Sequence, residues 1–252
     1  MVAVVERVSG GSPVLEIRDV HRAFRGLRAV AGCSFELDHG SVTGLIGPNG
    51  SGKTTMLNLV SGQLRPDRGM VVYRGRDITR LGPDQRSRLG IGRTFQLVRI
   101  FHDLSVLENM LAVSRKRSLA EATRNALEIL DRVKLTALRD APGDHLSYGQ
   151  RKLLEFARVV SLEPDLFLLD EPFAGINRVL AADLADLIES LRALGKTILI
   201  IDHEMKIITK ICDRLVVMDH GEILTEGSTA TVQADPRVLD AYFGKEITTH
   251  GA

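Results

Sequence analysis

Apolar and polar residues alternate along the first third of the chain, and a period of two is typical of strands with one buried face. The alternation runs through VLEIRDVHRAF (14–24) and CSFELDHGSVTGLIG (33–47). It returns in MVVYRGRDI (70–78), after the turn sequence RPDRG. The early part of the chain is therefore predicted to be rich in β structure.

Helical spacing replaces this alternation from about Leu104 to Val133, where SVLENMLAV and SLAEATRNALEILDRV contain few β-branched residues. A further helix is expected in LSYGQRKLLEFARVV (146–160), which has an apolar face. These segments predict a helical piece inserted near the middle of the chain.

Two short apolar runs, DLFLLD (165–170) and TILIID (197–202), are typical of parallel strands that are covered on both faces. Between them, VLAADLADLIESLRAL places leucines on one helical face, and Gly195 ends that helix. The last pattern, RLVVMDHGEILTEG, predicts a hairpin that turns at His220-Gly221. Strand, helix and strand in this order predict an α/β fold with a mostly parallel sheet wrapped by helices.

Composition narrows the class of protein. With 33 Lys and Arg against 32 Asp and Glu the net charge is +1, which argues against a nucleic-acid binder that relies on its overall field. Cys33 and Cys212 fit neither a disulfide framework nor a metal-ligand spacing, so both are expected to be buried thiols. No apolar run approaches the roughly 20 residues that span a bilayer, and MVAVVERVSGGSP is too short and too charged for a signal peptide. The sequence indicates a cytosolic protein that would reach a membrane only through a partner.

A glycine-rich segment carries the strongest chemical signal. It consists of Gly47, Pro48, Asn49, Gly50, Ser51, Gly52, Lys53, Thr54 and Thr55, and its first eight residues fit G-x-x-x-x-G-K-[ST]. Glycines allow positive φ and bring successive N–H groups within reach of a polyphosphate. Lys53 supplies a charge for the outer phosphates and Thr54 a hydroxyl ligand for Mg²⁺. Because a strand is predicted before the segment and a helix after it, we expect it to bind nucleotide phosphates.

Two acids follow the apolar run in LFLLDEP. Asp170 would stand at the carboxyl edge of the sheet, where open α/β sheets bind ligands, and can hold Mg²⁺ directly or through water. Glu171 is adjacent to it and can polarise an attacking water. The alternative, that these acids merely open a loop, is disfavoured because a buried apolar strand rarely ends in two acids without a cation nearby.

Ser147 stands at the start of the helix predicted from LSYGQ, and by itself it is most simply an N-cap. Together with the glycine loop and the two acids, however, this segment resembles the signature of the ATP-binding cassette (ABC) ATPases. The resemblance implies that Ser147, Tyr148, Gly149 and Gln150 bind the γ-phosphate of ATP held by a second, facing cassette. A serine hydroxyl and a helix N-terminus both favour an anion.

The resemblance implies roles for further residues. Gln96 in GRTFQ would contact the metal and the attacking water, and His203 in LIIDHEM would contact the γ-phosphate. Phe24 would stack on adenine, a contact that tolerates many orientations. Without the resemblance, Phe24 is a core phenylalanine and the role of His203 is undecided. AGIN (174–177) takes the place of a loop that crosses the dimer interface.

Two residues depart from the family pattern: Tyr148 replaces a glycine and Asn177 replaces an aspartate. Within the family, GIGRTFQLVRIFHDLSVLENM, LSYGQRKLLEFAR, DEPFAGIN and DPRVLDAYFGKE are similar to the ATP-binding subunits of branched-chain amino-acid importers. Relatives that handle urea, amides or other small polar solutes share much of this similarity.

The resemblance implies a P-loop NTPase (RecA-like) core with an N-terminal antiparallel β subdomain and an inserted α-helical subdomain. The core would comprise residues 1–96 and 161–252, and the insert residues from about 97 to 160. ATP and Mg²⁺ are the implied cofactors. The implied Mg²⁺ ligands are Thr54, Gln96 and Asp170, and the catalytic residues Glu171, His203 and Gln96.

The implied partners are integral-membrane permease subunits, a second ATPase cassette and, indirectly, a solute-binding protein, with no nucleic acid. The chain would be cytoplasmic and peripheral on the inner face of the cell membrane. The sequence leaves open whether the second cassette is a sister chain or another copy. Three other functions are alternatives to the transport ATPase: a P-loop kinase, a non-transport ABC protein, and a scaffold that binds ATP without hydrolysing it. A kinase gives no reason for LSYGQ, no coiled coil or zinc cysteines support a non-transport role, and Glu171 with His203 disfavours a scaffold.

Overall fold

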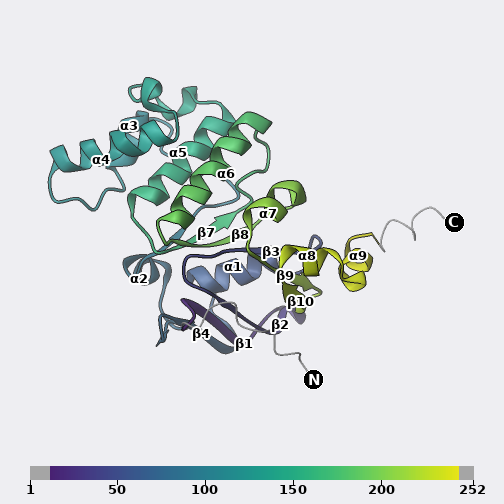
Figure 1. Cartoon of the computed structure of the whole chain (residues 1–252). Helices are drawn as coiled ribbons and strands as arrows, with labels where there is room; N and C mark the ends of the chain where they lie inside the picture. Colours follow the sequence, from purple (N-terminus) through teal and green to yellow (C-terminus); the bar gives the residue numbers. More distant parts are fainter. Residues whose placement is uncertain (1–11, 244–252) are drawn as a thin grey trace.

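The computed structural model describes residues 12–243, which form two β-sheets and a set of helices (Figure 1). The larger sheet has six strands. In spatial order they are β10 (Glu222–Gly227), β9 (Arg214–Asp219), β3 (Val42–Ile46), β8 (Thr197–Ile201), β7 (Leu166–Asp170) and β6 (Ile91–Arg93). All neighbouring pairs are parallel except β9 and β10, which form the antiparallel hairpin predicted at His220-Gly221.

The smaller sheet is antiparallel and comes from the N-terminal part of the chain. Its strands, in spatial order, are β2 (Leu27–Leu37), β1 (Leu15–Phe24), β4 (Arg68–Tyr73) and β5 (Arg76–Asp77). The predicted β-rich region is therefore confirmed, but 33–47 contains the end of one strand, a turn and the whole of β3. The N-terminal segment MVAVVERVSGGSP, which is too short and too charged for a signal peptide, lies almost entirely outside the described residues.

The helices are distributed over the two faces of the larger sheet (Figure 1). They are α1 (Lys53–Ser61), α2 (Pro83–Arg88), α3 (Val106–Leu111), α4 (Leu119–Arg132), α5 (Tyr148–Ser161), α6 (Arg178–Ala193), α7 (Met205–Ile211), α8 (Thr229–Gln233) and α9 (Pro236–Phe243), with short 3₁₀ turns at Thr136–Leu138 and Gly143–His145. Helix α1 lies between the two sheets, whereas α3, α4 and α5 pack on one another as a helical lobe on the other side. The expected helical insert is thus present in the fold.

Both faces of the larger sheet are buried, because alternate residues of each central strand enter two different apolar cores. Phe167 and Leu169 of β7 pack with the helical lobe, α6 and α7. Leu166 and Leu168 pack instead with α1 and the smaller sheet. Burial on both faces accounts for the continuous apolar runs of β7 and β8, and it agrees with the prediction from DLFLLD and TILIID.

Short elements were not predicted from the sequence. Strand β6 has three residues, and helices α2, α7 and α8 have five to seven, which is too short for a period to become visible. Cys33 and Cys212 are both free and buried, as predicted. Burial raises the pKa of the Cys33 thiol to about 11, so it stays protonated at neutral pH.

A buried arginine closes the C-terminal end of α1. Arg86 is 1% exposed. Its Nη1 donates to the carbonyls of Leu59 and Val60, both at 2.6 Å, and its Nη2 donates to the carbonyl of Ile78 at 2.7 Å. Its Nε donates to the carbonyl of Leu81 at 3.0 Å. One guanidinium therefore satisfies backbone acceptors of α1 and of the segment between β5 and α2.

We predict that Arg86→Met lowers the free energy of unfolding by about 2–4 kcal/mol, because buried carbonyls lose their donors. Urea unfolding followed by circular dichroism measures the change. Arg88→Met is the matched control, since the side chain of Arg88 is 74% exposed and pairs with the exposed Asp84. Equal stability of the two variants would show that the Arg86 contacts contribute nothing.

Candidate functional site at the carboxyl edge of the sheet

The glycine loop connects β3 to α1 and lies tightly against backbone of other segments. Gly47 has a φ of 147°, and a Cβ atom there would lie 2.0 Å from the Met218 carbonyl oxygen. Gly52 has a φ of 105°, and its Cβ would lie 2.3 Å from the carbonyl oxygen of Ala29. Backbone cannot yield as a flexible side chain would, so both positions require glycine. Gly50 also has positive φ, but it faces open space.

Lys53 is folded back over this loop. Its Nζ donates to the carbonyls of Gly47 and Pro48 at 2.8 and 2.9 Å. Burial lowers the pKa of Lys53, and the nearby Glu171 carboxylate acts in the opposite direction. Helix α1 begins after Gly52 without any side-chain cap, so its first N–H groups are available to an anion.

The remaining residues of the glycine loop differ in their exposure. Asn49, Gly50 and Thr54 are exposed, Thr55 is half-buried, and Ser51 is buried with its N–H donating to the Pro48 carbonyl. The segment from Gly47 to Thr55 therefore lies between a strand and a helix, as the sequence predicted, and its binding of phosphates stays a prediction.

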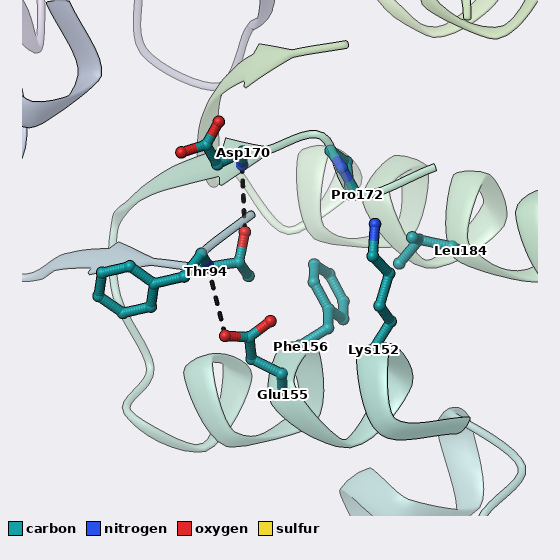
Figure 2. A pocket seen from close by; sticks show the side chains of 8 residues that line it. Thr94, Lys152, Glu155, Phe156, Asp170, Pro172 and Leu184 are labelled. Atoms are coloured by element: carbon teal, nitrogen blue, oxygen red, sulfur yellow. Dashed lines mark hydrogen bonds between the residues drawn. The ribbon is translucent and has the colours of Figure 1, made fainter. Parts of the chain in front are cut away.

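Asp170 ends β7 and is 3% exposed. Its Oδ2 lies 3.0 Å from Nη2 of Arg93. Its N–H donates to the Thr94 hydroxyl at 3.2 Å, as Figure 2 shows. Burial raises the pKa of Asp170, and Arg93 opposes that rise. The other carboxylate oxygen, Oδ1, is buried and has no hydrogen-bond partner within residues 12–243. Sequence reasoning missed Arg93, whose position beside Asp170 depends on the pairing of β6 with β7.

Glu171 follows with a φ of 48°, in the left-handed region that a residue with a Cβ atom seldom adopts. Its N–H donates to the Ile201 carbonyl at 2.8 Å, and its carbonyl accepts from Nζ of Lys152 at 2.5 Å. Its Oε2 accepts from Nε2 of Gln96 at 3.1 Å. The structure thus brings together Gln96 and Glu171, two residues that the sequence predicted separately.

His203 follows β8 and is 64% exposed on its side chain. The buried Asp202 beside it holds the local backbone: Oδ1 accepts from the N–H groups of His203 and Glu204, at 2.8 and 3.0 Å. Oδ2 accepts from the N–H of Phe173 at 2.9 Å. Asp202 therefore fixes the segments after β7 and β8 relative to each other. Sequence reasoning missed it, although its place at the end of an apolar strand repeats that of Asp170.

Ser147 is the N-cap of α5, as predicted. Its hydroxyl accepts from the N–H of Gln150 at 3.3 Å, and its own N–H donates to the Gln150 side chain at 2.8 Å. A Cβ atom at Gly149 would lie 2.5 Å from Leu180 Cδ1, so glycine allows α5 and α6 to approach closely. No hydrogen bond joins residues 147–150 to the glycine loop in the described part of this chain.

The two departures from the family pattern have clear structural settings. Asn177 is the N-cap of α6, and its Oδ1 accepts from the N–H of Leu180 at 3.0 Å. Tyr148 is 42% exposed and packs close to Gly175, in the loop that precedes Asn177.

Phe24 ends β1, is 39% exposed, and lies beneath the guanidinium of Arg22 at 4.8 Å. Phe24 is thus a surface ring, not the core residue that its sequence context alone suggests.

The sequence profile of the ABC transporter family matches residues 30–174. This chain belongs to that family. A second profile, described as branched-chain amino acid ATP-binding cassette transporter, matches residues 222–248.

Relatives cover nearly the whole cassette. This chain is 37% identical over 247 residues to the probable branched-chain amino acid transport ATP-binding protein LivG of Archaeoglobus fulgidus, and the match covers 92% of this chain and 96% of that one. It is 37% identical over 238 residues to the lipopolysaccharide export system ATP-binding protein LptB of Acidithiobacillus ferridurans, covering 94% and 99%. A crystal structure of an ABC transporter cassette in its ADP conformation matches with a TM-score of 0.84 and 34% identity, over 93% of this chain and 100% of that one.

The expected fold class is confirmed: the cassette has a P-loop core, an antiparallel β subdomain and an inserted helical subdomain. Members of the family bind and hydrolyse ATP, and this cassette is an ATPase. Such subunits dimerise and work with membrane permeases. Among the described residues, none of the helices combines the length and apolar character needed to cross a membrane.

Proposed function

We propose that this chain is the ATP-hydrolysing subunit of an importer for branched-chain amino acids. The observation that carries the catalytic part is the pairing of Gln96 with Glu171 at the edge of the sheet that also bears the glycine loop. The solute part rests on similarity: the profile match at residues 222–248 and the LivG relative both name branched-chain amino acids.

In this proposal the glycine loop, Lys53 and the start of α1 bind the phosphates of ATP. Lys53 exchanges its contacts with the Gly47 and Pro48 carbonyls for contacts with phosphate oxygens. Glu171 orients or deprotonates the water that attacks the γ-phosphate in line, and His203 and Lys53 stabilise the charge that develops. The exposed His203 is free to turn toward a nucleotide.

The residues present fit a Mg²⁺ ion. Asp170 Oδ1 is a buried carboxylate oxygen without a partner among the described residues, and Thr54 offers an exposed hydroxyl. Residues 12–243 contain no cluster of three or more His, Cys, Asp or Glu side chains arranged for a metal, so phosphate oxygens and waters would complete its coordination. Asp170, Thr54 and Gln96 would hold the ion, which would neutralise phosphate charge.

A second cassette completes the site. Residues from Ser147 to Gln150 cap the γ-phosphate of ATP held by the partner. The start of α5 is exposed and makes no hydrogen bond to the glycine loop within residues 12–243, which leaves it available for this contact. The exposed ring of Phe24 stacks on adenine. The partner is a sister cassette or a second copy of this chain.

The helical subdomain, from about residue 97 to 160, and the loop after Gln96 form the surface for the permeases. Leu97 and Phe101 are large apolar residues that are 80% and 48% exposed there, which supports a partner on this surface. Contact with permeases would keep the cassette on the cytoplasmic face of the membrane, while a solute-binding protein acts on the other side.

We predict that Glu171→Gln lowers kcat for ATP hydrolysis by about 100-fold or more, because the amide cannot accept the proton of the attacking water. ATP affinity should stay within about threefold, since in the described part of the chain Glu171 is hydrogen-bonded to Gln96, Lys152 and Ile201 and not to the loop from Gly47 to Thr55. Release of free phosphate and binding of a fluorescent ATP analogue measure the two quantities. Wild-type turnover in the variant would contradict the role of Glu171, and transfer to a bound acceptor would indicate a kinase.

Lys53→Ala should instead weaken binding itself, raising the Kd of a fluorescent ATP analogue by about tenfold or more, because a charge-assisted contact to phosphate is lost. Lys210→Ala, which removes the same charge from the end of α7, is the control. Unchanged affinity in Lys53→Ala would contradict the proposed phosphate contact.

The solute is tested by transport. With its permeases, second cassette and solute-binding protein in vesicles loaded with Mg·ATP, the chain should drive uptake of radiolabelled leucine, and the complex with Glu171→Gln should not. Uptake of urea or an amide in place of leucine would correct the solute alone. The similarity to LptB favours lipopolysaccharide export as the second candidate function. Extraction of lipopolysaccharide by the complex, without uptake of amino acids, would support that candidate.

A further inference from the structure

Two charged side chains of α5, Lys152 and Glu155, are buried beside the site. They are 7% and 6% exposed and stand three residues apart on one face of the helix. Both line a small cavity with Thr94 and Asp170. Figure 2 shows them projecting from α5 toward the segments that follow β6 and β7. Buried charges are costly unless they are paired or hydrogen-bonded, so their contacts call for an explanation.

Lys152 holds the backbone of Glu171. Its Nζ donates to the Glu171 carbonyl at 2.5 Å, while the Glu171 N–H is held by the Ile201 carbonyl at 2.8 Å. Both backbone groups of a residue with a φ of 48° are thereby fixed. A left-handed conformation of this kind persists only where surrounding contacts determine it.

Glu155 holds the loop that carries Gln96. Its Oε1 accepts from the N–H of Phe95 at 3.4 Å and from the N–H of Arg99 at 3.2 Å. These two donors lie on either side of Gln96 in the sequence. One carboxylate oxygen therefore anchors the loop on both sides of the glutamine side chain, which is itself exposed.

We propose that Lys152 and Glu155 are positioning residues through which α5 sets the distance between Gln96 and Glu171. The proposal rests on the role proposed above for Glu171. The two side chains fix the backbones that carry a hydrogen-bonded pair, Gln96 Nε2 and Glu171 Oε2, at 3.1 Å. Ser147 caps α5 about 8 Å along the helix axis from Lys152. Contact of Ser147 with a nucleotide held by the partner cassette would therefore be transmitted to the backbones of Gln96 and Glu171 through one helix.

The experiment measures kcat and KM for ATP with the full chain. Lys152→Met keeps the length of the side chain but removes the donor, and Glu155→Met removes the acceptor. We expect each variant to lower kcat by about tenfold or more while KM stays within about twofold, because the phosphate-binding loop is untouched. Glu155→Gln keeps an acceptor oxygen for both N–H groups, so its kcat should stay within about threefold of wild type.

The matched controls are Lys196→Met and Asp165→Asn. Lys196 Nζ lies 3.0 Å from Asp165 Oδ1, and these residues immediately precede β8 and β7, at the opposite edge of the sheet. They report the loss of a lysine–carboxylate contact away from the site. Thermal unfolding of every variant separates a loss of stability from a loss of turnover.

A fall in kcat with Lys152→Met and Glu155→Met, absent from both controls and largely rescued in Glu155→Gln, supports the proposal. Wild-type kcat in the Met variants overturns it, as does a fall in kcat that only follows the loss of stability or comes with an equal rise in KM. If Lys152→Met does not fold, the comparison of Glu155→Met with Glu155→Gln decides alone. Wild-type turnover in Glu171→Gln would instead overturn the proposed function, so the two failures are distinguishable.

Discussion

Burial of the larger sheet on both faces is the constraint that organises this molecule. Every residue of β3, β7 and β8 is buried, so polar side chains can gather only where these strands end. Asp170 and Asp202 stand at the ends of β7 and β8, and the glycine loop follows β3. The apolar core thereby concentrates the glycine loop and the acidic groups at one edge of the sheet.

The glycine loop is held in place by backbone contacts from distant parts of the chain. The Gly221 N–H donates to the Ser51 carbonyl at 3.0 Å, and the Gly221 carbonyl accepts from the Ala31 N–H at 2.8 Å. The turn of the β9–β10 hairpin therefore joins the loop to β2 of the smaller sheet. Together with the close approach of Gly47 to Met218, these contacts hold the glycine loop against the hairpin and the smaller sheet.

Helix α5 joins two parts of the proposed site. Its capped N-terminus is exposed at Ser147, whereas Lys152 and Glu155 are buried little more than one and two turns farther on. The close packing of Gly149 against Leu180 ties the same helix to α6, which is capped by Asn177. In the proposed mechanism, a nucleotide bound at the start of α5 would be linked to Gln96 and Glu171 by direct contacts, without a long pathway of intervening residues.

The sequence by itself determined the elements with strong local signals. It predicted the buried strands β7 and β8, the glycine loop between a strand and a helix, the Ser147 cap and the hairpin at His220-Gly221, because periodicity, glycine and capping preferences act over a few residues. Only the tertiary structure decided which groups meet. Gln96 and Glu171 are 75 positions apart and Arg93 and Asp170 are 77 apart, so no local pattern records their contacts. The buried Arg86, Lys152 and Asp202 bind backbone carbonyls or N–H groups, which every residue possesses, and sequence letters alone cannot show which backbone they hold.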